Sequence, residues 1–169
     1  PADPTANIRK SGIGKKEVER DRVLSEDEIR TLYRKLPDAD LIIQTEQAVW
    51  LALSTACRIG ELLRAKWEHI DLDKATWLIP AENAKNGKPH TIYLSKFAVE
   101  KFERLRQING TSAWCYPNPD DDKPVHISTV TRQLSDRQQV PGTTNQANRT
   151  SKVDALLLSG GHWTPHDLR

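Results

Sequence analysis

One arginine stands among apolar side chains in the stretch Thr55-Ala56-Cys57-Arg58-Ile59-Gly60-Glu61-Leu62-Leu63. A guanidinium keeps its proton at any physiological pH, and burying it without a partner costs free energy. Arg58 must therefore meet either an internal carboxylate or an external anion. Glu61 is the internal candidate if a helix begins here, because residues three apart are then neighbours. A phosphate or another oxyanion is the external candidate, since the planar fork of guanidinium donors fits either one.

His166 and Arg169 follow a second local signal, the start of a helix. Thr164 is a good N-cap, Pro165 suits the first helical position, and Asp167 complements the helix dipole. We expect His166 and Arg169 to lie on one face of the first turn. The amide donors at a helix start favour anions, so this pair is either an anion site or an ordinary decoration of a surface helix.

Lys85 precedes the pair Asn86-Gly87, and Lys88 follows it. Asn-Gly favours a tight β-hairpin turn, and strands are predicted on both sides, at 76–79 and 91–94. A lysine at a hairpin tip is exposed. It either keeps the sheet edge soluble or delivers a proton to a leaving group.

These candidates need a scaffold, and the apolar periodicity predicts a mostly helical one. Ser25 and Glu28 form a capping box, which marks the start of the first helix. A further strand within 67–72 would complete a small three-stranded antiparallel sheet. We therefore expect an α+β domain, mostly helical. The predicted helices span about 26–36, 41–56, 61–66, 95–108, 127–138 and 151–158, and a last one opens at Thr164.

The composition suits one soluble domain with a large working surface. The chain has 169 residues, of which 37% are hydrophobic and 28% charged, enough for a single core. No apolar run reaches transmembrane length. Two cysteines do not make a disulfide framework, so we expect a reducing cytoplasm. The net charge of +2 permits a nucleic-acid partner without arguing for one.

Residues 1–22 have the composition of a linker, with the basic pairs Arg9-Lys10 and Lys15-Lys16 and no apolar period. They are either a solvated tail or a basic connector that runs along DNA from a preceding domain. The chain lacks Met and stops at Arg169, just after a helix-start signal. We therefore expect an excised fragment, whose folded domain spans 23–169.

The chain resembles the catalytic domain of the tyrosine recombinases, the phage-type integrases, in three features that occur in the family's order. These are Arg58-Ile59-Gly60-Glu61-Leu62 after an apolar helix, a lysine at a β-hairpin turn, and His166-x-x-Arg169 at a helix start. Locally, Thr164-Pro165-His166-Asp167-Leu168-Arg169 and Lys88-Pro89-His90 with Leu94-Ser95 look most like the integrases of prophages and genomic islands. The likeness covers residues 23–169.

The resemblance implies a set of roles. Arg58 and Arg169 would be the catalytic arginines, Lys85 the hairpin lysine and His166 the histidine, with Glu61 orienting Arg58. In this family a tyrosine attacks a DNA phosphodiester and leaves a 3′-phosphotyrosine and a free 5′-hydroxyl. Two guanidinium forks can hold the transition-state charge without a metal. The lysine protonates the departing oxygen, and the histidine hydrogen-bonds the phosphate or manages the nucleophile's proton. No cofactor is implied, because the covalent intermediate stores the energy for rejoining.

Site-specific integration of a prophage or genomic island is the expected function. The implied partners are double-stranded DNA attachment sites, a host DNA-bending protein and an excisionase. Full-length protein would form a tetramer on DNA by exchanging its C-terminal segment between neighbours, whereas the fragment would be a monomer. The expected location is the bacterial cytoplasm, at the nucleoid and away from membranes. The side chains expected to contact DNA are Arg9, Lys10, Lys15, Lys16 and Lys88.

The chain departs from the family's pattern at the nucleophile. That tyrosine lies beyond the family's second arginine, and Tyr33, Tyr93 and Tyr116 come too early to match it. We therefore expect this fragment alone to be unable to cleave DNA. The polar stretch 140–150 is predicted to be a mobile loop, as an insertion or facing DNA, and Trp163 is either a core residue or a base-stacking platform.

Three other functions remain open. The first is a type IB topoisomerase, which shares the active-site logic. The second is a non-catalytic DNA-binding module that kept the fold. The third is a generic α+β domain whose arginine, lysine and histidine residues are decorative.

Overall fold

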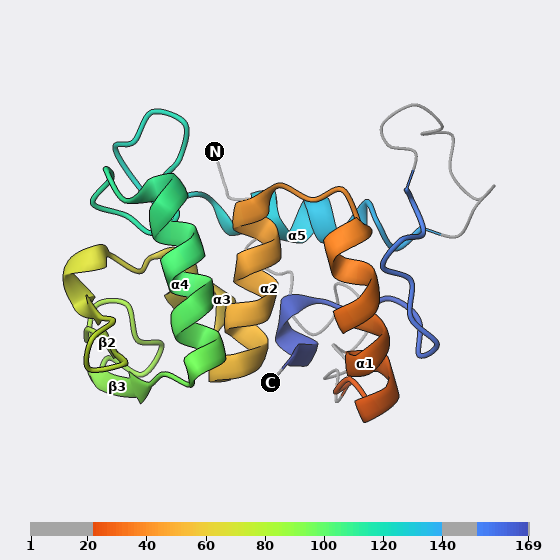
Figure 1. Ribbon diagram of the computed structural model, residues 1–169, viewed down its shortest axis with the longest axis horizontal. Coiled ribbons are helices and arrows are strands. Elements are labelled where there is room, and N and C mark those ends of the chain that lie inside the picture. Colours follow the sequence, from red (N-terminus) through yellow and green to blue (C-terminus); the bar gives the residue numbers. More distant parts are fainter. Residues whose placement is uncertain (1–21, 140–151, 169) are drawn as a thin grey trace, which may run out of the picture.

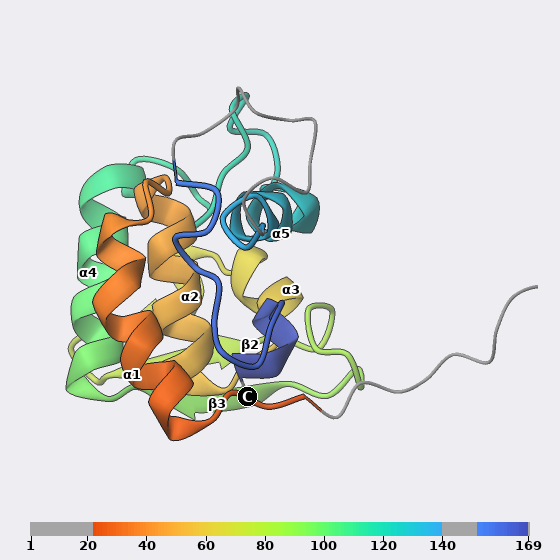
Figure 2. The same cartoon turned by 90° about the vertical axis from the view of Figure 1, so that its right-hand side faces the viewer.

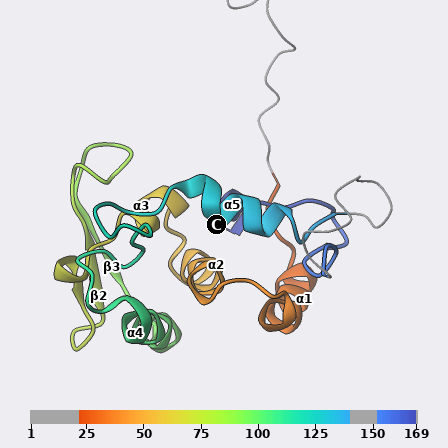
Figure 3. The ribbon, with the colours of Figure 1, turned by 90° about the horizontal axis from the view of Figure 1, so that it is seen from above.

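Three helices lie in a row, and the middle one packs against one of these neighbours and against a second layer of elements (Figures 1 and 3). The computed structural model describes residues 22–139 and 152–168. The row consists of α1 (Glu26–Lys35), α2 (Ile43–Thr55) and α4 (Lys96–Asn109). The middle helix is α2, which is buried on nearly all sides from Thr45 to Ala52. A helix that is apolar almost all round belongs inside a domain, and this one forms its core.

The predicted capping box starts α1. Ser25 Oγ accepts a hydrogen bond from the Glu28 amide at 3.3 Å, and Glu28 Oε2 accepts one from the Ser25 amide at 3.1 Å. Leu32 then faces the core, and the helix passes into a short 3-10 turn, η2 (Leu36–Asp38). The sequence predicted this helix within one residue at each end.

The predicted three-stranded antiparallel sheet is confirmed and lies beside α4 (Figure 2). A 3-10 turn, η3 (Trp67–His69), leads into β1 (Ile70–Asp71), followed by β2 (Thr76–Ile79) and β3 (His90–Tyr93), in the order β1-β2-β3. Register pairs Trp77 with Ile92 and Ile79 with His90. Trp77 is buried and packs its ring 5.7 Å from that of Phe102 on α4.

The tight hairpin predicted at Asn86-Gly87 is wrong. Residues 80–89 all lie between β2 and β3 as a long loop. Gly87 does adopt the positive φ of a turn, at +67°, but the strands end before it because Pro80 and Pro89 flank them and cannot donate to the ladder. The Pro80 carbonyl instead accepts hydrogen bonds from two amides within the loop, at 3.0 and 3.1 Å.

A second layer covers the other side of α2. It contains α3 (Ile59–Leu63), α5 (Ile127–Ser135) and a final 3-10 turn, η4 (Pro165–Leu168) (Figure 3). Buried side chains of these elements, such as Leu62, Leu134 and Leu168, join the core formed by α2. The starts of α3 and α5 and the η4 turn approach one another here, and two candidate residues, Arg58 and His166, lie on α3 and η4.

Two predicted helices differ in the structure. Residues 152–158 form turns rather than a helix, because their backbone pairs with the segment after α5. The Leu156 amide donates to the Arg137 carbonyl, and the Val153 carbonyl accepts from the Gln139 amide, both at 2.8 Å. The element at Thr164 is a 3-10 turn, although Thr164 does act as its cap, since Thr164 Oγ1 accepts from the His166 amide at 3.3 Å.

Two further searches cover the described parts of the chain, 22–139 and 152–168. No helix there is long and apolar enough to span a membrane. No group of three or more His, Cys, Asp or Glu side chains there could hold a metal ion.

Candidate active site

Arg58, Lys85 and His166 line one surface hollow of about 370 Å³. They come from three separate places in the chain: the start of α3, the β2–β3 loop and the η4 turn. The remaining lining residues are Ile59, Gly60, Glu61, Arg64, Asn83 and Ile127. Cationic and hydrogen-bonding side chains therefore converge on an open site with one acidic member.

Arg58 pairs with an internal carboxylate and also keeps donors for an external anion, the two alternatives that the sequence left open. Its Nη1 donates to Glu61 Oε1 at 3.2 Å, so the internal carboxylate is present. The Arg58 side chain is nevertheless 44% exposed and faces the hollow. A guanidinium has five donors, so one bond to Glu61 leaves the fork able to bind an anion.

Glu61 is the buried acid that fixes the site. Its side chain accepts hydrogen bonds from the Arg58 amide at 3.1 Å and from the Lys85 amide at 3.3 Å, besides the guanidinium of Arg58. Burial raises the pKa of Glu61, but these donors outweigh it and hold the pKa below its ordinary value. A charged Glu61 therefore orients Arg58, as the sequence suggested, and also anchors the loop that carries Lys85, which the sequence did not reveal.

Lys85 has a fixed backbone and an exposed side chain. Besides its own amide bond to Glu61, the loop is tied to α3 by Asn83, whose Nδ2 donates to the Arg64 carbonyl at 3.2 Å. The ammonium group can therefore move at the hollow while its attachment point stays in place.

His166 is exposed, and the turn that carries it is held in place by buried neighbouring residues. The buried carboxylate of Asp167 accepts from the Thr164 amide at 2.7 Å and from Thr164 Oγ1 at 3.1 Å. The preceding Trp163 is fully buried, and its indole N–H donates to the Leu156 carbonyl at 3.0 Å. Trp163 is thus a core residue and not a base-stacking platform.

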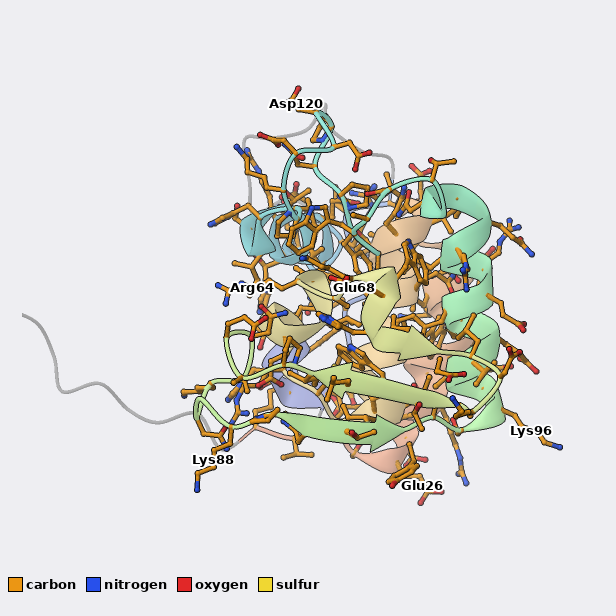
Figure 4. The ribbon with its side chains drawn as sticks, turned by 90° about the vertical axis from the view of Figure 1, so that its left-hand side faces the viewer. Glu26, Arg64, Glu68, Lys88, Lys96 and Asp120 are labelled. Atoms are coloured by element: carbon orange, nitrogen blue, oxygen red, sulfur yellow. The ribbon has the colours of Figure 1, made fainter. Side chains whose placement is uncertain are left out.

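Several predicted residues lie elsewhere. Arg169 lies outside the described residues, so its pairing with His166 stays a prediction. Also outside the described residues are Arg9, Lys10, Lys15, Lys16 and the stretch 140–150. Lys88 is exposed near the tip of the β2–β3 loop and points away from the molecule (Figure 4).

None of the three tyrosines lines the hollow. Tyr116 is fully buried, and its pKa is raised by that burial. Tyr33 packs its ring 5.5 Å from that of Trp50, and Tyr93 is 83% exposed on β3. This arrangement agrees with the expectation that the nucleophile is none of them.

Sequence reasoning missed two lining residues, Arg64 and Asn83. Arg64 is a second arginine at the end of the short helix that Arg58 opens, and this was the available signal. Asn83 gave no signal, because its place depends on the unexpected length of the β2–β3 loop.

A larger hollow of about 690 Å³ lies against the sheet and shares no residue with the first. Four of its lining residues are acidic, namely Glu68, Asp71, Asp73 and Glu103. Arg106 also lines it, but the acidic side chains are in excess, so the smaller cationic hollow is the better candidate for a polyanion.

The helical row and the small three-stranded sheet are the fold of the DNA breaking-and-rejoining catalytic domains. The chain belongs to the phage integrase family, whose profile matches residues 22–169.

Curated relatives agree with this assignment. The chain is 35% identical to the prophage integrase IntZ of Escherichia coli K12 over 133 residues, which are 79% of this chain and 33% of that protein. It is 32% identical to the integrase of Enterobacteria phage P4 over 132 residues, 71% of this chain and 27% of that protein. The chain thus spans about a third of the length of the curated relatives it matches.

Solved structures share the fold. The XerA recombinase superposes with a TM-score of 0.61 at 17% identity, covering 87% of this chain and 47% of that one. A lambda integrase tetramer bound to a Holliday junction superposes with a TM-score of 0.60 at 23% identity, covering 91% and 41%.

Proposed function

We propose that the protein containing this chain is a tyrosine-type site-specific DNA recombinase that integrates a prophage or a genomic island. The observation that carries the proposal is that Arg58, Lys85 and His166, far apart in sequence, line one exposed hollow. Family membership and the prophage integrases among the relatives support the same function.

The chemistry follows from the charge that develops on a DNA phosphate. A tyrosine oxygen attacks phosphorus, the P–O5′ bond breaks, and negative charge spreads over the non-bridging oxygens. Arg58 and Arg169 hold that charge with their guanidinium forks. Lys85 gives a proton to the departing 5′ oxygen, and His166 donates to a phosphate oxygen or takes the tyrosine proton.

The nucleophile comes from outside this set of residues, since Tyr33, Tyr93 and Tyr116 are not suited to it. Rejoining reverses the first step, with the free 5′ oxygen of a new partner attacking the phosphotyrosine. The number of phosphodiester bonds is conserved, so the reaction needs neither ATP nor another cofactor. This chain alone, without that tyrosine, is expected to be inactive.

The proposed partner is double-stranded DNA at an attachment site, in the bacterial cytoplasm at the nucleoid. Solved neighbours include integrases bound to DNA, one of them a tetramer. We extend this to a DNA-bound tetramer of the full-length protein that exchanges C-terminal segments, assisted by a host DNA-bending protein and an excisionase. Basic side chains at Arg9, Lys10, Lys15, Lys16 and Lys88 would contact the phosphate backbone.

The decisive experiment traps the covalent intermediate. Full-length protein is incubated with DNA containing the ends of its mobile element, and protein–DNA adducts are separated on a denaturing gel. We expect an adduct whose yield falls about 100-fold or more in Arg58→Ala, because one transition-state clamp is lost. Arg30→Ala, at an exposed arginine of α1, is the control.

Three results would redirect the proposal. Relaxation of any supercoiled plasmid without site preference would favour a topoisomerase. Binding of DNA without an adduct would favour a non-catalytic module. Unchanged recombination in Arg58→Ala would mean that the cationic residues are decorative.

A further inference from the structure

The turn that carries His166 is attached to the very beginning of the domain. The Leu24 amide donates to the Asp167 carbonyl at 3.2 Å, directly after His166. Figure 2 shows the first described residues running beside η4. The segment entering the domain and the candidate active-site turn are therefore neighbours, although they lie at opposite ends of the described chain.

Glu28 makes a second connection between the same two regions. Its Oε1 accepts a hydrogen bond from the Gly160 amide at 2.9 Å and another from Arg22 Nη2 at 2.8 Å. Only Oε2 takes part in the capping box with Ser25. Capping α1 would leave Oε1 free for water, yet Glu28 is only 5% exposed. The bonds of Oε1 thus serve something other than the helix start.

Arg22 completes the junction from the other side. Its Nη1 donates to the Gly160 carbonyl at 2.8 Å, and its Nη2 reaches the Gly161 carbonyl at 3.4 Å. Together, Glu28 and Arg22 bind both the amide and the carbonyl of Gly160. A Cβ at position 160 would overlap the Arg22 guanidinium and lie 2.7 Å from Glu28 Oε1, so a side chain there would push the ends of these two side chains aside.

Gly160 is one of two fixed points on the way to His166, and the buried Trp163 is the other. From Gly161, which has a φ of +84°, the chain runs to Trp163, whose amide donates to Gln138 Oε1 at 2.7 Å. It then enters the η4 turn. The contacts at Gly160 and Leu24 therefore hold the 160–168 segment from the side of the domain entry, while Gln138 holds it from the side of α5.

We propose that Glu28 is a positioning residue for His166, and that the junction of Arg22, Glu28 and Gly160 sets the place of the η4 turn from the entry of the domain. Its bearing on catalysis rests on the function proposed above. The dependence of the position of His166 on Glu28 does not rest on that function.

The physical reason is that a buried carboxylate with several donors is rigid. Replacing it with a neutral amide removes the charge that draws Arg22 and two amides together. The 160–168 segment then gains freedom, and a catalytic group displaced by about 1 Å can lose up to about 100-fold in rate.

The test compares two variants of the full-length protein that both weaken the start of α1. Glu28→Gln disturbs the contacts to Gly160 and Arg22. Ser25→Ala removes the capping hydroxyl but leaves Glu28 Oε1 in place. If Glu28 only stabilises the fold, the two variants should behave alike when each is measured at the same interval below its own melting temperature.

The first readout is the imidazole resonance of His166 in histidine-labelled protein, assigned with His166→Gln among the five histidines. We expect Glu28→Gln to shift and broaden it and Ser25→Ala to leave it at the wild-type position. The second readout is single-turnover DNA cleavage at saturating DNA, which should fall about tenfold or more in Glu28→Gln, with DNA affinity unchanged, and stay near wild type in Ser25→Ala.

An unmoved His166 resonance in a folded Glu28→Gln protein would overturn the proposal, and so would equal cleavage by the two variants. If Glu28→Gln does not fold, Arg22→Gln takes its place, with the exposed Arg30→Gln as its control, and the same two outcomes decide. If wild-type protein forms no DNA adduct, the proposed function fails while the resonance comparison still decides the positioning role.

Discussion

The carboxylate of Glu61 accepts a hydrogen bond from the backbone amide of Lys85 at 3.3 Å, although the two residues are 24 positions apart. The same oxygen binds the guanidinium of Arg58 at 3.2 Å. One buried acid thus holds both the Arg58 guanidinium and the backbone position from which the Lys85 side chain extends. Two like charges close together repel each other, and the negative charge of Glu61 offsets that repulsion.

Replacing Glu61 with alanine should destabilise the domain. The amides of Arg58 and Lys85 would lose their acceptor, and each unsatisfied buried group costs about 1–3 kcal/mol. We expect the free energy of unfolding to fall by at least about 2 kcal/mol, measured by urea denaturation. The control is Glu68→Ala, because the Glu68 side chain is 64% exposed and pairs with Lys66 at the surface. It should change stability by less than about 1 kcal/mol. Equal losses in the two variants would contradict the role of Glu61.

Stability should fall in acid through Glu28 and Glu61. The Ser25 amide holds the pKa of Glu28 down against its burial, with help from Arg22 and the Gly160 amide, and the pKa of Glu61 is also lowered. A carboxyl whose pKa is lower in the folded protein stabilises it above its unfolded pKa, ordinarily 4.5. That contribution disappears as the pH falls through the folded-state value.

The measurement is the free energy of unfolding from pH 7 to pH 3. Glu28→Gln should flatten the acid limb of this curve, because one of the titrating groups is gone. A variant that loses stability equally at all pH values would show that Glu28 does not titrate in this range.

Lys85 should matter only when the leaving group needs a proton. With a normal 5′ oxygen, Lys85→Ala in the full-length protein should slow DNA cleavage about 100-fold or more. With sulfur at that bridging position the rate should be nearly normal, because a thiol with a pKa of about 8.5 leaves as the anion. Lys74→Ala, at an exposed lysine paired with Asp71, is the control for both substrates. A defect of equal size on both would rule out proton donation by Lys85.

Trp163 should contribute to folding and not to base recognition. Its side chain is fully buried, so Trp163→Ala should lower the free energy of unfolding by about 3–5 kcal/mol. Trp114→Ala should cost less, because that ring is only partly buried and carries Lys66 over one face. Urea denaturation of the two variants tests this. A small loss at Trp163 combined with weaker DNA binding would contradict the core assignment.

Local signals in the sequence predicted the parts of the fold that local physics decides. The capping box of Ser25 and Glu28 fixed the start of α1, and the β-branched and aromatic run of β2 gave that strand at its observed bounds. Thr164 was found as a cap for the same reason. Each of these depends on atoms only a few residues apart.

What the sequence could not predict depends on distant backbone groups. Residues 152–158 have a helical pattern, but their amides and carbonyls pair across to Arg137 and Gln139 instead. Nor could a sequence pattern reveal that Glu61 binds the Lys85 amide or that Glu28 binds the Gly160 amide. Every residue except proline has the same backbone N–H, so the sequence does not show which of these donors a distant side chain will bind.

The net charge is only +2, but four acidic side chains line the hollow beside the sheet, so the charge is unevenly distributed over the surface. Figure 4 shows Arg64, which lines the cationic hollow, and Glu68, which lines the acidic one, both above the strands of the sheet in that view. With the proposed function, a DNA duplex would be repelled near the acidic hollow and attracted near the cationic one. Charge reversal at Glu68 and Asp71 would remove this repulsion and let DNA also bind beside the sheet, away from the candidate site.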